Sequence, residues 1–305
     1  MSDRHARKEI ADGTIGATKT GFLFNYYTQQ TFDLRPKILD MMQRTSCYLP
    51  GDRKLSQWRD RTTQTLRGSP TTFAFLAKTT LQGARHLEAQ ARDGRIGILN
   101  FASATKPGGG FRSGAQAQEE SIARSSTLFK SLESQVARPF YSTHRNDENR
   151  GFYTDMMIWS PGVLIFRDDQ GGWVHPLEVD VVTSPAVNAK VVRGRLPRGT
   201  SLENEIEVAM HERMGKILAL FERKHTTDLV LGSFGTGVFK NDVGMVAEIW
   251  RQLLYDPGAR FEHSFRSVVF AIPDYKTLQV VQNAFTQRHA GRPRWMQVPG
   301  RSRPP

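Results

Sequence analysis

Cysteine is nearly absent from this sequence: Cys47 is the only one in 305 residues. An internal disulfide is therefore impossible, and we expect a reducing, intracellular compartment, either cytoplasmic or nuclear. No apolar run approaches the roughly 18 residues that a membrane helix needs. The first 13 residues also lack the apolar core of a secretory signal. We therefore expect no membrane association.

Several patterns of known chemistry are missing as well. The chain has no C-x2-C pair and no H-E-x-x-H motif, and its eight histidines are scattered. We therefore expect neither a metal nor a cofactor. Residues 110–114 read GFRSG, which is not the G-x-S-x-G elbow of a serine hydrolase. Since no histidine partner can be assigned to Cys47, nucleophilic catalysis is not expected either.

Negative charge is scarce relative to positive charge. The 42 Lys and Arg residues exceed the 30 Asp and Glu residues, which gives a formal net charge of +12. Such a surplus suits polyanionic partners, whether nucleic acid, a polyphosphate or an anionic surface. A solvated basic surface together with a basic tail would give the same net charge. Direct nucleic-acid binding is therefore supported only by the net charge.

Strand-like apolar runs alternate with helix-like periodicity over most of the chain. This alternation predicts a three-layer α/β/α domain with a largely parallel or mixed sheet. The Ser-Pro-Gly at 160–162 predicts a hairpin or a bent strand, and Thr200 with Glu203 predicts a capping box. We expect strands at 71–77, 95–100, 155–166, 174–183, 228–231 and 267–272, and helices at 35–45, 79–92, 200–221, 243–253 and 276–288. One face of the 200–221 helix carries Ile206, Met210, Met214, Ile217 and Phe221.

The two ends of the chain differ from its centre in composition and in expected structure. Residues 1–66 predict an N-terminal helical accessory region, with loose order over 1–20 and either a helix or a linker over 56–66. Residues 67–290 are expected to form the main α/β domain. Residues 291–305 form a basic tail rich in Pro and Arg.

Two glycine-rich loops directly follow predicted strands. The first, with Lys106–Gly110 (KPGGG), ends the strand at 95–100, because Pro removes a donor and glycine permits unusual backbone angles. Gln118-Glu119-Glu120 then begins a segment whose apolar residues are compatible with one helix face. A charged loop is expected further along the chain, at 144–150. Carboxylates at a helix start are favoured by its dipole. The apolar residues of that face are Ile122, Leu128, Phe129 and Leu132.

The second loop, Gly232–Phe239 (GSFGTGVF), is a strand-to-helix turn. Its successive backbone N–H groups are suited to an anion nest, and the helix that follows adds its positive end. The loop lacks the lysine of a P-loop and the glycine order of the dinucleotide fingerprint. Because ligands bind at the carboxyl ends of strands, we expect both loops to open onto one cleft.

The first loop resembles the signature of poly(ADP-ribose) glycohydrolases, which is three glycines, six to eight residues and then QEE. Here Gly108-Gly109-Gly110 is followed by seven residues and Gln118-Glu119-Glu120. The flanks NFASATKPGGGF and AQEESIARSSTL are most similar to the microbial branch, both bacterial and fungal. The second loop resembles the diphosphate-binding loop of macrodomains. The resemblance covers residues 71–288 and departs from the family at Ser103, where Asn is common, and at Lys240, where a small residue is common.

The resemblance implies a role for each residue of these motifs. Glu120 would protonate the leaving ribose oxygen and then deprotonate the attacking water, while Glu119 would bind ribose hydroxyls. Neighbours on a helix do not face each other, so this pair fits a one-carboxylate mechanism better than two carboxylates across the sugar. Asn100 would bind substrate or brace the loop, and Gln118 would support the turn. The implied substrate-binding residues are Asn100, Gly108, Gly109, Gly110, Gln118, Gly232, Ser233, Phe234, Gly235, Thr236, Gly237, Val238 and Phe239.

The expected function is hydrolysis of the ribose–ribose O-glycosidic bonds of poly(ADP-ribose), with ADP-ribose as product. The expected partners are the polymer and ADP-ribosylated proteins, and the expected setting is reversal of ADP-ribosylation in the DNA damage response. Three alternatives stay open: a mono-ADP-ribosyl hydrolase on protein- or nucleic-acid-linked ADP-ribose, a non-catalytic ADP-ribose reader, and a nucleic-acid binder. The pair Glu119 and Glu120 argues against the reader, because binding an anion does not require two carboxylates.

Overall fold

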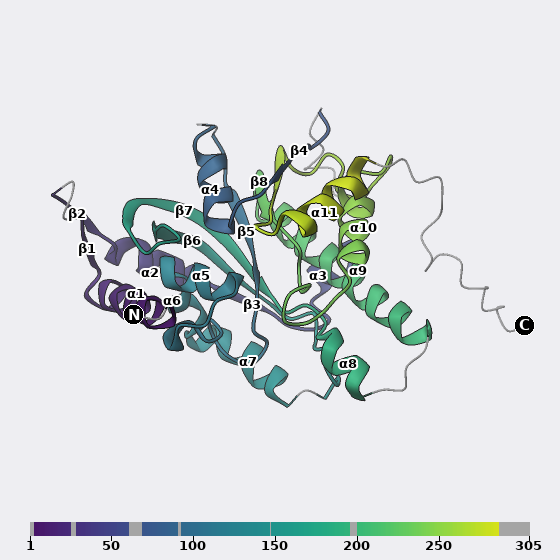
Figure 1. Cartoon of the computed structure of the whole chain (residues 1–305), viewed down its shortest axis with the longest axis horizontal. Coiled ribbons are helices and arrows are strands. Elements are labelled where there is room, and N and C mark those ends of the chain that lie inside the picture. The colour runs from purple at the N-terminus through teal and green to yellow at the C-terminus, as the bar shows by residue number, and fades with distance from the viewer. Residues whose placement is uncertain are drawn as a thin grey trace, which may run out of the picture.

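A mixed seven-stranded sheet forms the centre of the computed structural model, which describes residues 3–25, 29–60, 69–90, 93–146, 148–195 and 200–286. Figure 1 shows the sheet with helices on both faces. The four pairings from β7 to β4 are parallel, whereas β6 and β3 are antiparallel to their neighbours. This confirms the predicted sheet. In spatial order the strands are β3 (Ser46–Tyr48), β6 (Met157–Arg167), β7 (Trp173–Ser184), β5 (Ile96–Phe101), β8 (Asp228–Leu231), β9 (Ser267–Ala271) and β4 (Thr72–Leu76).

The helices form one layer on each side of the sheet. Successive strand residues point to opposite faces, so Leu99 packs in one apolar cluster and Ile98 in the other. The cluster around Leu99 contains α9 (Thr200–Arg223), α10 (Val243–Leu254) and α11 (Tyr275–Thr286). The cluster around Ile98 contains α2 (Arg35–Arg44), α4 (Thr80–Glu88), α5 (Gln118–Ser125), α6 (Leu128–Leu132) and α7 (Arg138–Arg145).

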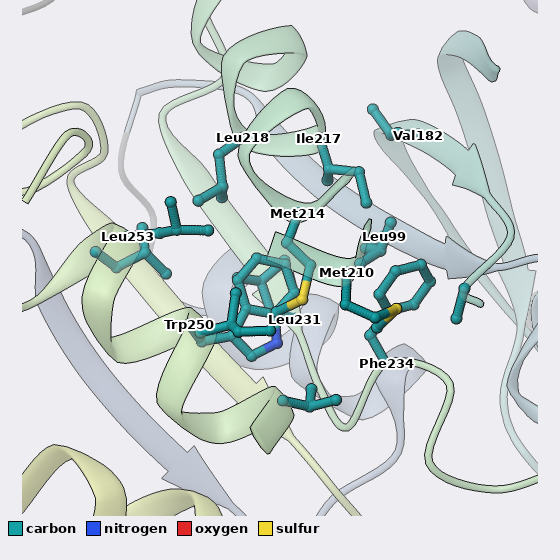
Figure 2. Packing of buried hydrophobic residues seen from close by; sticks show 14 of the residues in the cluster. Leu99, Val182, Met210, Met214, Ile217, Leu218, Leu231, Phe234, Trp250 and Leu253 are labelled. Atoms are coloured by element: carbon teal, nitrogen blue, oxygen red, sulfur yellow. The ribbon is translucent and has the colours of Figure 1, made fainter. Parts of the chain in front are cut away.

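The apolar face predicted for the 200–221 helix is confirmed. Its five residues, from Ile206 to Phe221, are at most 1% exposed in α9. Figure 2 shows Met210 and Met214 packed beside Leu99, Leu231 and Trp250, which come from β5, β8 and α10. The side chain of Thr200 lies outside the described residues, so the predicted capping box stays a prediction.

The expectation of loose order over residues 1–20 was wrong. Residues Asp3–Thr20 form α1, which packs on α5 and on the short 3-10 helix η1 (Phe111–Ser113). Its docking is partly polar, because Arg4 and Arg7 donate to the backbone carbonyls of residues 113 and 114, while Ala11 is buried in a small apolar cluster with Phe111. Such contacts leave little apolar periodicity in the sequence, and the helix was missed for that reason.

The rest of the N-terminal region is only partly helical. The predicted helix at 35–45 is confirmed as α2, with a proline in its first turn. Two short strands, β1 (Phe22–Asn25) and β2 (Gln30–Asp33), form a separate hairpin, and α3 covers Arg53–Ser56. Strand β3 pairs with β6 in the main sheet, which an all-helical accessory layer did not foresee. The domain boundary at residue 66 stays a prediction, and residues 61–68 and 291–305 lie outside the described ones.

Two further expectations near the first loop need correction. The segment after Gln118 is not one helix, because Ser126 is extended and bridges to Ile165 between α5 and α6. Its hydroxyl donates to the carbonyl of Ile122 and accepts from the N–H of Leu128, so it replaces helical hydrogen bonds. The charged loop expected from His144 begins only after α7, and the His144 side chain is buried.

Candidate active site

The two glycine-rich loops meet because their strands are parallel neighbours. Strands β5 and β8 pair in register, with Ile98 opposite Val230. The chain therefore leaves both strands at the same edge of the sheet. Residues of both loops, together with residues of α1, line one cavity of about 1380 Å³. This confirms that the loops open onto a single cleft.

Gln118 joins the start of α5 to the end of β5. Its Oε1 accepts a hydrogen bond of 2.8 Å from the N–H of Phe101, and its Nε2 donates to the carbonyl of Leu99 at 2.7 Å. Nε2 also donates to the hydroxyl of Thr80 at 3.2 Å. All of these contacts are internal, which fits the supporting role that the resemblance implies.

Glu119 is a buried carboxyl at the base of the cavity. Its side chain is 2% exposed, and its oxygens accept from the N–H of Ser103 at 2.6 Å and from Nδ2 of Asn100 at 3.3 Å. Burial outweighs these donors and raises the pKa of Glu119 from 4.5 to about 8. The nearby charge of Glu120 acts in the same direction. At neutral pH Glu119 is therefore protonated, so the pair of carboxyls adds less negative charge near an anionic ligand than two ionised groups would.

Asn100 lies beneath Glu119 and is fully buried. Its Nδ2 also donates to Oγ1 of Thr183 at 3.1 Å, directly across the β5–β7 pair. Of the two roles that the resemblance left open, these contacts favour bracing. The contact from Ser103 uses its backbone N–H, so the departure from the family's Asn at this position leaves the hold on Glu119 intact.

Glu120 is only partly buried and lines the cavity. Its Oε1 accepts a hydrogen bond of 2.9 Å from the N–H of Gly110. Gly109 has a left-handed backbone with φ 59°, and a Cβ there would lie 2.3 Å from Glu120 Oε1 and 3.2 Å from Glu119 Oε2. Both carboxyls thus reach the same glycine and share one wall of the cavity, rather than facing each other across it.

The second loop offers backbone donors. Among the hydrogen bonds of the described residues, no partner accepts from five of its N–H groups. Asn241 Nδ2 donates to the carbonyl of Gly235 at 3.0 Å, and Trp250 Nε1 donates to that of Gly232 at 3.1 Å, so buried side chains hold the loop from behind. Unpaired N–H groups gathered in one loop, three of them consecutive at residues 237–239, are suited to a diphosphate. These five groups belong to Ser233, Gly235, Gly237, Val238 and Phe239.

The expected contribution of the following helix is weaker than predicted. Helix α10 begins only at Val243, and the Asp242 carboxylate caps it by accepting from the N–H of Met245 at 2.7 Å. An acid therefore already occupies the positive end of the helix. Lys240 lies at the rim of the cavity with a left-handed backbone, φ 59°, and its carbonyl accepts from Arg193.

Sequence reasoning missed part of the cavity. Four residues of α1 line it, as do Arg124 of α5 and Asp169 of the β6–β7 turn. Arg124 stands four residues after Glu120, a spacing that places both on one helix face, so the sequence did hold that signal. For α1 the sequence held the same four-residue spacing between the apolar residues Ala6 and Ile10. The four residues of α1 are Asp3, Ala6, Arg7 and Ile10.

Other chemistry finds little support in the described part of the chain. No group of three His, Cys, Asp or Glu side chains there is arranged to hold a metal ion. The metal-free and cofactor-free reaction stays a prediction. Burial raises the pKa of the Cys47 thiol, which opposes thiolate chemistry. Within the same residues, no helix is long and apolar enough to cross a membrane.

Comparison with known proteins decides the family. The model of the microbial-type PARG catalytic domain, where PARG denotes poly(ADP-ribose) glycohydrolase, matches residues 11–168. The chain belongs to this family. The structure of the poly(ADP-ribose) glycohydrolase from Thermomonospora curvata is 34% identical, covers 92% of this chain and 100% of its own, and superposes with a TM-score of 0.84.

Two ligand complexes of such glycohydrolases are also similar. The T. curvata enzyme bound to the inhibitor ADP-HPD is 35% identical, covers 93% of this chain and 100% of its own, with a TM-score of 0.80. The Deinococcus radiodurans enzyme in complex with ADP-ribose is 34% identical, covers 82% and 97%, with a TM-score of 0.73. No curated protein matched the chain. The resemblance inferred from the glycine loop and QEE is thus confirmed.

Proposed function

We propose that Glu120 is the single general acid and base of this poly(ADP-ribose) glycohydrolase. The family to which the chain belongs acts on poly(ADP-ribose) as a glycoside hydrolase, so the chain hydrolyses the ribose–ribose bonds of the polymer. One observation carries the role of Glu120. Both carboxyls border Gly109, but Glu119 is buried and held by internal donors, whereas Glu120 is partly exposed to the cavity.

The proposed reaction uses the Glu120 carboxyl twice. Its proton passes to the ribose oxygen of the leaving unit as the bond from that oxygen to the anomeric carbon breaks. A water molecule then attacks the anomeric carbon, and the Glu120 carboxylate accepts a proton from that water. The hydrogen bond from Gly110 holds the carboxyl in place through both steps. Because Glu119 does not lie across the cavity, a second carboxylate nucleophile has no support.

The diphosphate of the unit that is released is proposed to bind the unpaired N–H groups of the second loop. The D. radiodurans relative binds ADP-ribose and the T. curvata relative binds ADP-HPD, which supports the same class of ligand in this cavity. Phe239 is half-buried at the loop's end, and its ring lies 6.0 Å from that of Tyr153. The ring of Phe239 is proposed to pack near the terminal ribose, and Glu119 is proposed to bind the hydroxyls of that ribose.

Proteins that carry the polymer are the proposed macromolecular partners. The alternative, release of a single ADP-ribose from a protein or nucleic acid, uses the same cavity. Automodified polymer and a mono-ADP-ribosylated protein, offered separately, distinguish the two, because a glycohydrolase specific for ribose–ribose bonds leaves the last unit attached.

The decisive experiment compares Glu120→Gln with the wild-type protein on automodified polymer. The change preserves size and removes the ionisable group, so turnover should fall by at least about 10² to 10⁴-fold. Calorimetry should show that ADP-ribose binding persists. Glu205→Gln, at an exposed position of α9 outside the cavity, serves as the matched control. A Glu120→Gln protein that keeps more than about a tenth of the wild-type rate would remove Glu120 from the acid role.

A further inference from the structure

The cavity continues past Glu120 toward α1, where two arginines line it. We propose that Arg7 of α1 and Arg124 of α5 bind the phosphates of the ADP-ribose unit on the leaving side of the bond. This subsite rests on the proposed function, because it needs a polymer whose next unit lies beyond Glu120.

The positions of the helices place these arginines on that side. Arg124 stands one turn after Glu120 on the same face of α5, about 6 Å further along the helix axis. Helix α1 contacts α5 and η1, while α5 contacts β5, which pairs with β8. Figure 1 shows the same order, with α5 between α1 and the β5–β8 pair. The second loop follows β8, so α5, which carries Glu120 and Arg124, lies between that loop and α1, which carries Arg7.

Both arginines lack a carboxylate partner. Within the described residues neither forms an ion pair. Arg124 is 7% exposed, and burial lowers its pKa, as does the nearby charge of Arg7. A buried guanidinium beside a like charge is unfavourable unless an anion compensates it. Glu120 and Asp169 are the acids that influence Arg124 electrostatically, and Asp169 is engaged with the hydroxyl of Thr79 at 2.7 Å.

Donors remain for a ligand after the internal contacts are counted. Arg7 Nε donates to the carbonyl of Gly114 at 2.8 Å, and Arg124 donates to the carbonyl of Ala115 at 2.6 Å and to Ser121 Oγ at 3.3 Å. A guanidinium has five N–H donors, so most stay available. Arginine binds phosphate through paired N–H groups, and every unit of the polymer carries a diphosphate. The internal contacts hold both guanidinium groups in place before the polymer arrives.

The test compares two substrates that differ only on the leaving side. One is poly(ADP-ribose); the other is ADP-ribose with umbelliferone at the anomeric carbon of its terminal ribose, which lacks a second diphosphate. Arg7→Gln should raise KM for the polymer about 10-fold, the size expected for one charge-assisted contact. The rise for the umbelliferyl substrate should be at least about 5-fold smaller, since the neutral leaving group makes no phosphate contact.

Arg4→Gln is the matched control. Arg4 lies on the same helix and donates in the same way, from Nε to the carbonyl of Ser113 at 2.9 Å, but it does not belong to the described lining of the cavity. Its removal should change neither KM. Arg7→Lys, which keeps the charge, should recover part of the loss for the polymer.

Equal losses on the two substrates, or equal effects of Arg4→Gln and Arg7→Gln, would reduce Arg7 to a brace of the loop and overturn the subsite. The wild-type protein gives an independent readout, because its KM for the polymer should rise more steeply with salt than its KM for the umbelliferyl substrate. Matching slopes would also reject the subsite. If the wild-type protein cleaved no polymer at all, the proposed function itself would fail, and that result is separate from any variant.

Discussion

Glu120 and Gly110 are joined by a hydrogen bond of 2.9 Å from the backbone N–H of the glycine to Oε1 of the carboxyl. The position of the carboxyl therefore follows the conformation of the glycine loop. That conformation depends on Gly108 and Gly109, whose φ angles of 66° and 59° are costly for any other residue. The three glycines are thus part of the apparatus that places the proposed acid.

Gly109→Ala should disable the reaction without touching a titratable group. The new Cβ would lie 2.3 Å from Glu120 Oε1, and the left-handed backbone is strained for alanine. We expect a loss of at least about 10²-fold in kcat/KM on the polymer, with circular dichroism confirming the fold. Gly16→Ala in α1 is the control, because a Cβ there meets nothing within 4 Å. Full activity of Gly109→Ala would contradict the tight loop.

The raised pKa of Glu119 should appear in the pH dependence of stability. Between pH 4.5 and about 8 the folded protein keeps the Glu119 proton that the unfolded chain loses. The free energy of unfolding should therefore fall as pH rises through this window, by at most about 1.4 kcal/mol per pH unit. Glu119→Gln removes this contribution. The free energy of unfolding of the variant minus that of the wild-type protein should therefore be larger at pH 8 than at pH 5. Urea unfolding at both pH values measures the difference; parallel pH profiles would show that the pKa is not raised.

Two glycines of the second loop should respond differently to substitution. A Cβ at Gly237 meets nothing within 4 Å, so Gly237→Val should fold normally and weaken ADP-ribose binding by blocking the approach of the phosphates. Gly235 has φ 74°, and its Cβ would lie 2.3 Å from that of Ala186, so Gly235→Ala should also lower stability.

Calorimetry with ADP-ribose and thermal unfolding separate the two effects. Arg85→Ala on α4 removes a positive charge outside the cavity lining, whereas the glycine variants change no charge. It should leave the dissociation constant for ADP-ribose unchanged if the loop, and not the net charge, holds the ligand. An unaltered dissociation constant for folded Gly237→Val would remove the diphosphate from this loop.

Removal of metal ions should leave the reaction unaffected. The proposed steps move one proton at Glu120 and need no Lewis acid. Dialysis against a chelator should therefore leave kcat on the polymer unchanged. Activity that disappears and then returns with a divalent ion would overturn the metal-free mechanism.

Local patterns in the sequence determined the sheet, most helices and the proposed catalytic motif. Burial of apolar side chains produces the apolar runs of β5, β8 and β9 and the helical periodicity of α9. Which residues are apolar can be read directly from the sequence. The spacing from Gly108 to Glu120 likewise predicted the family, because a tight glycine turn and the acids after it are neighbours in sequence.

Only the tertiary structure decided what surrounds that motif. The burial of Glu119 and its raised pKa come from packing against distant strands, which no local pattern records. Helix α1 docks through Ala11, which is buried in a small apolar cluster with Phe111, and through Arg4 and Arg7, which bind carbonyls more than 100 residues away. Polar contacts of that kind have no periodic signal, so the sequence predicted loose order there. The sequence predicted that both loops open onto one cleft, but only the assembled sheet showed that β5 and β8 are direct neighbours, because the pairing of distant strands has no local signal.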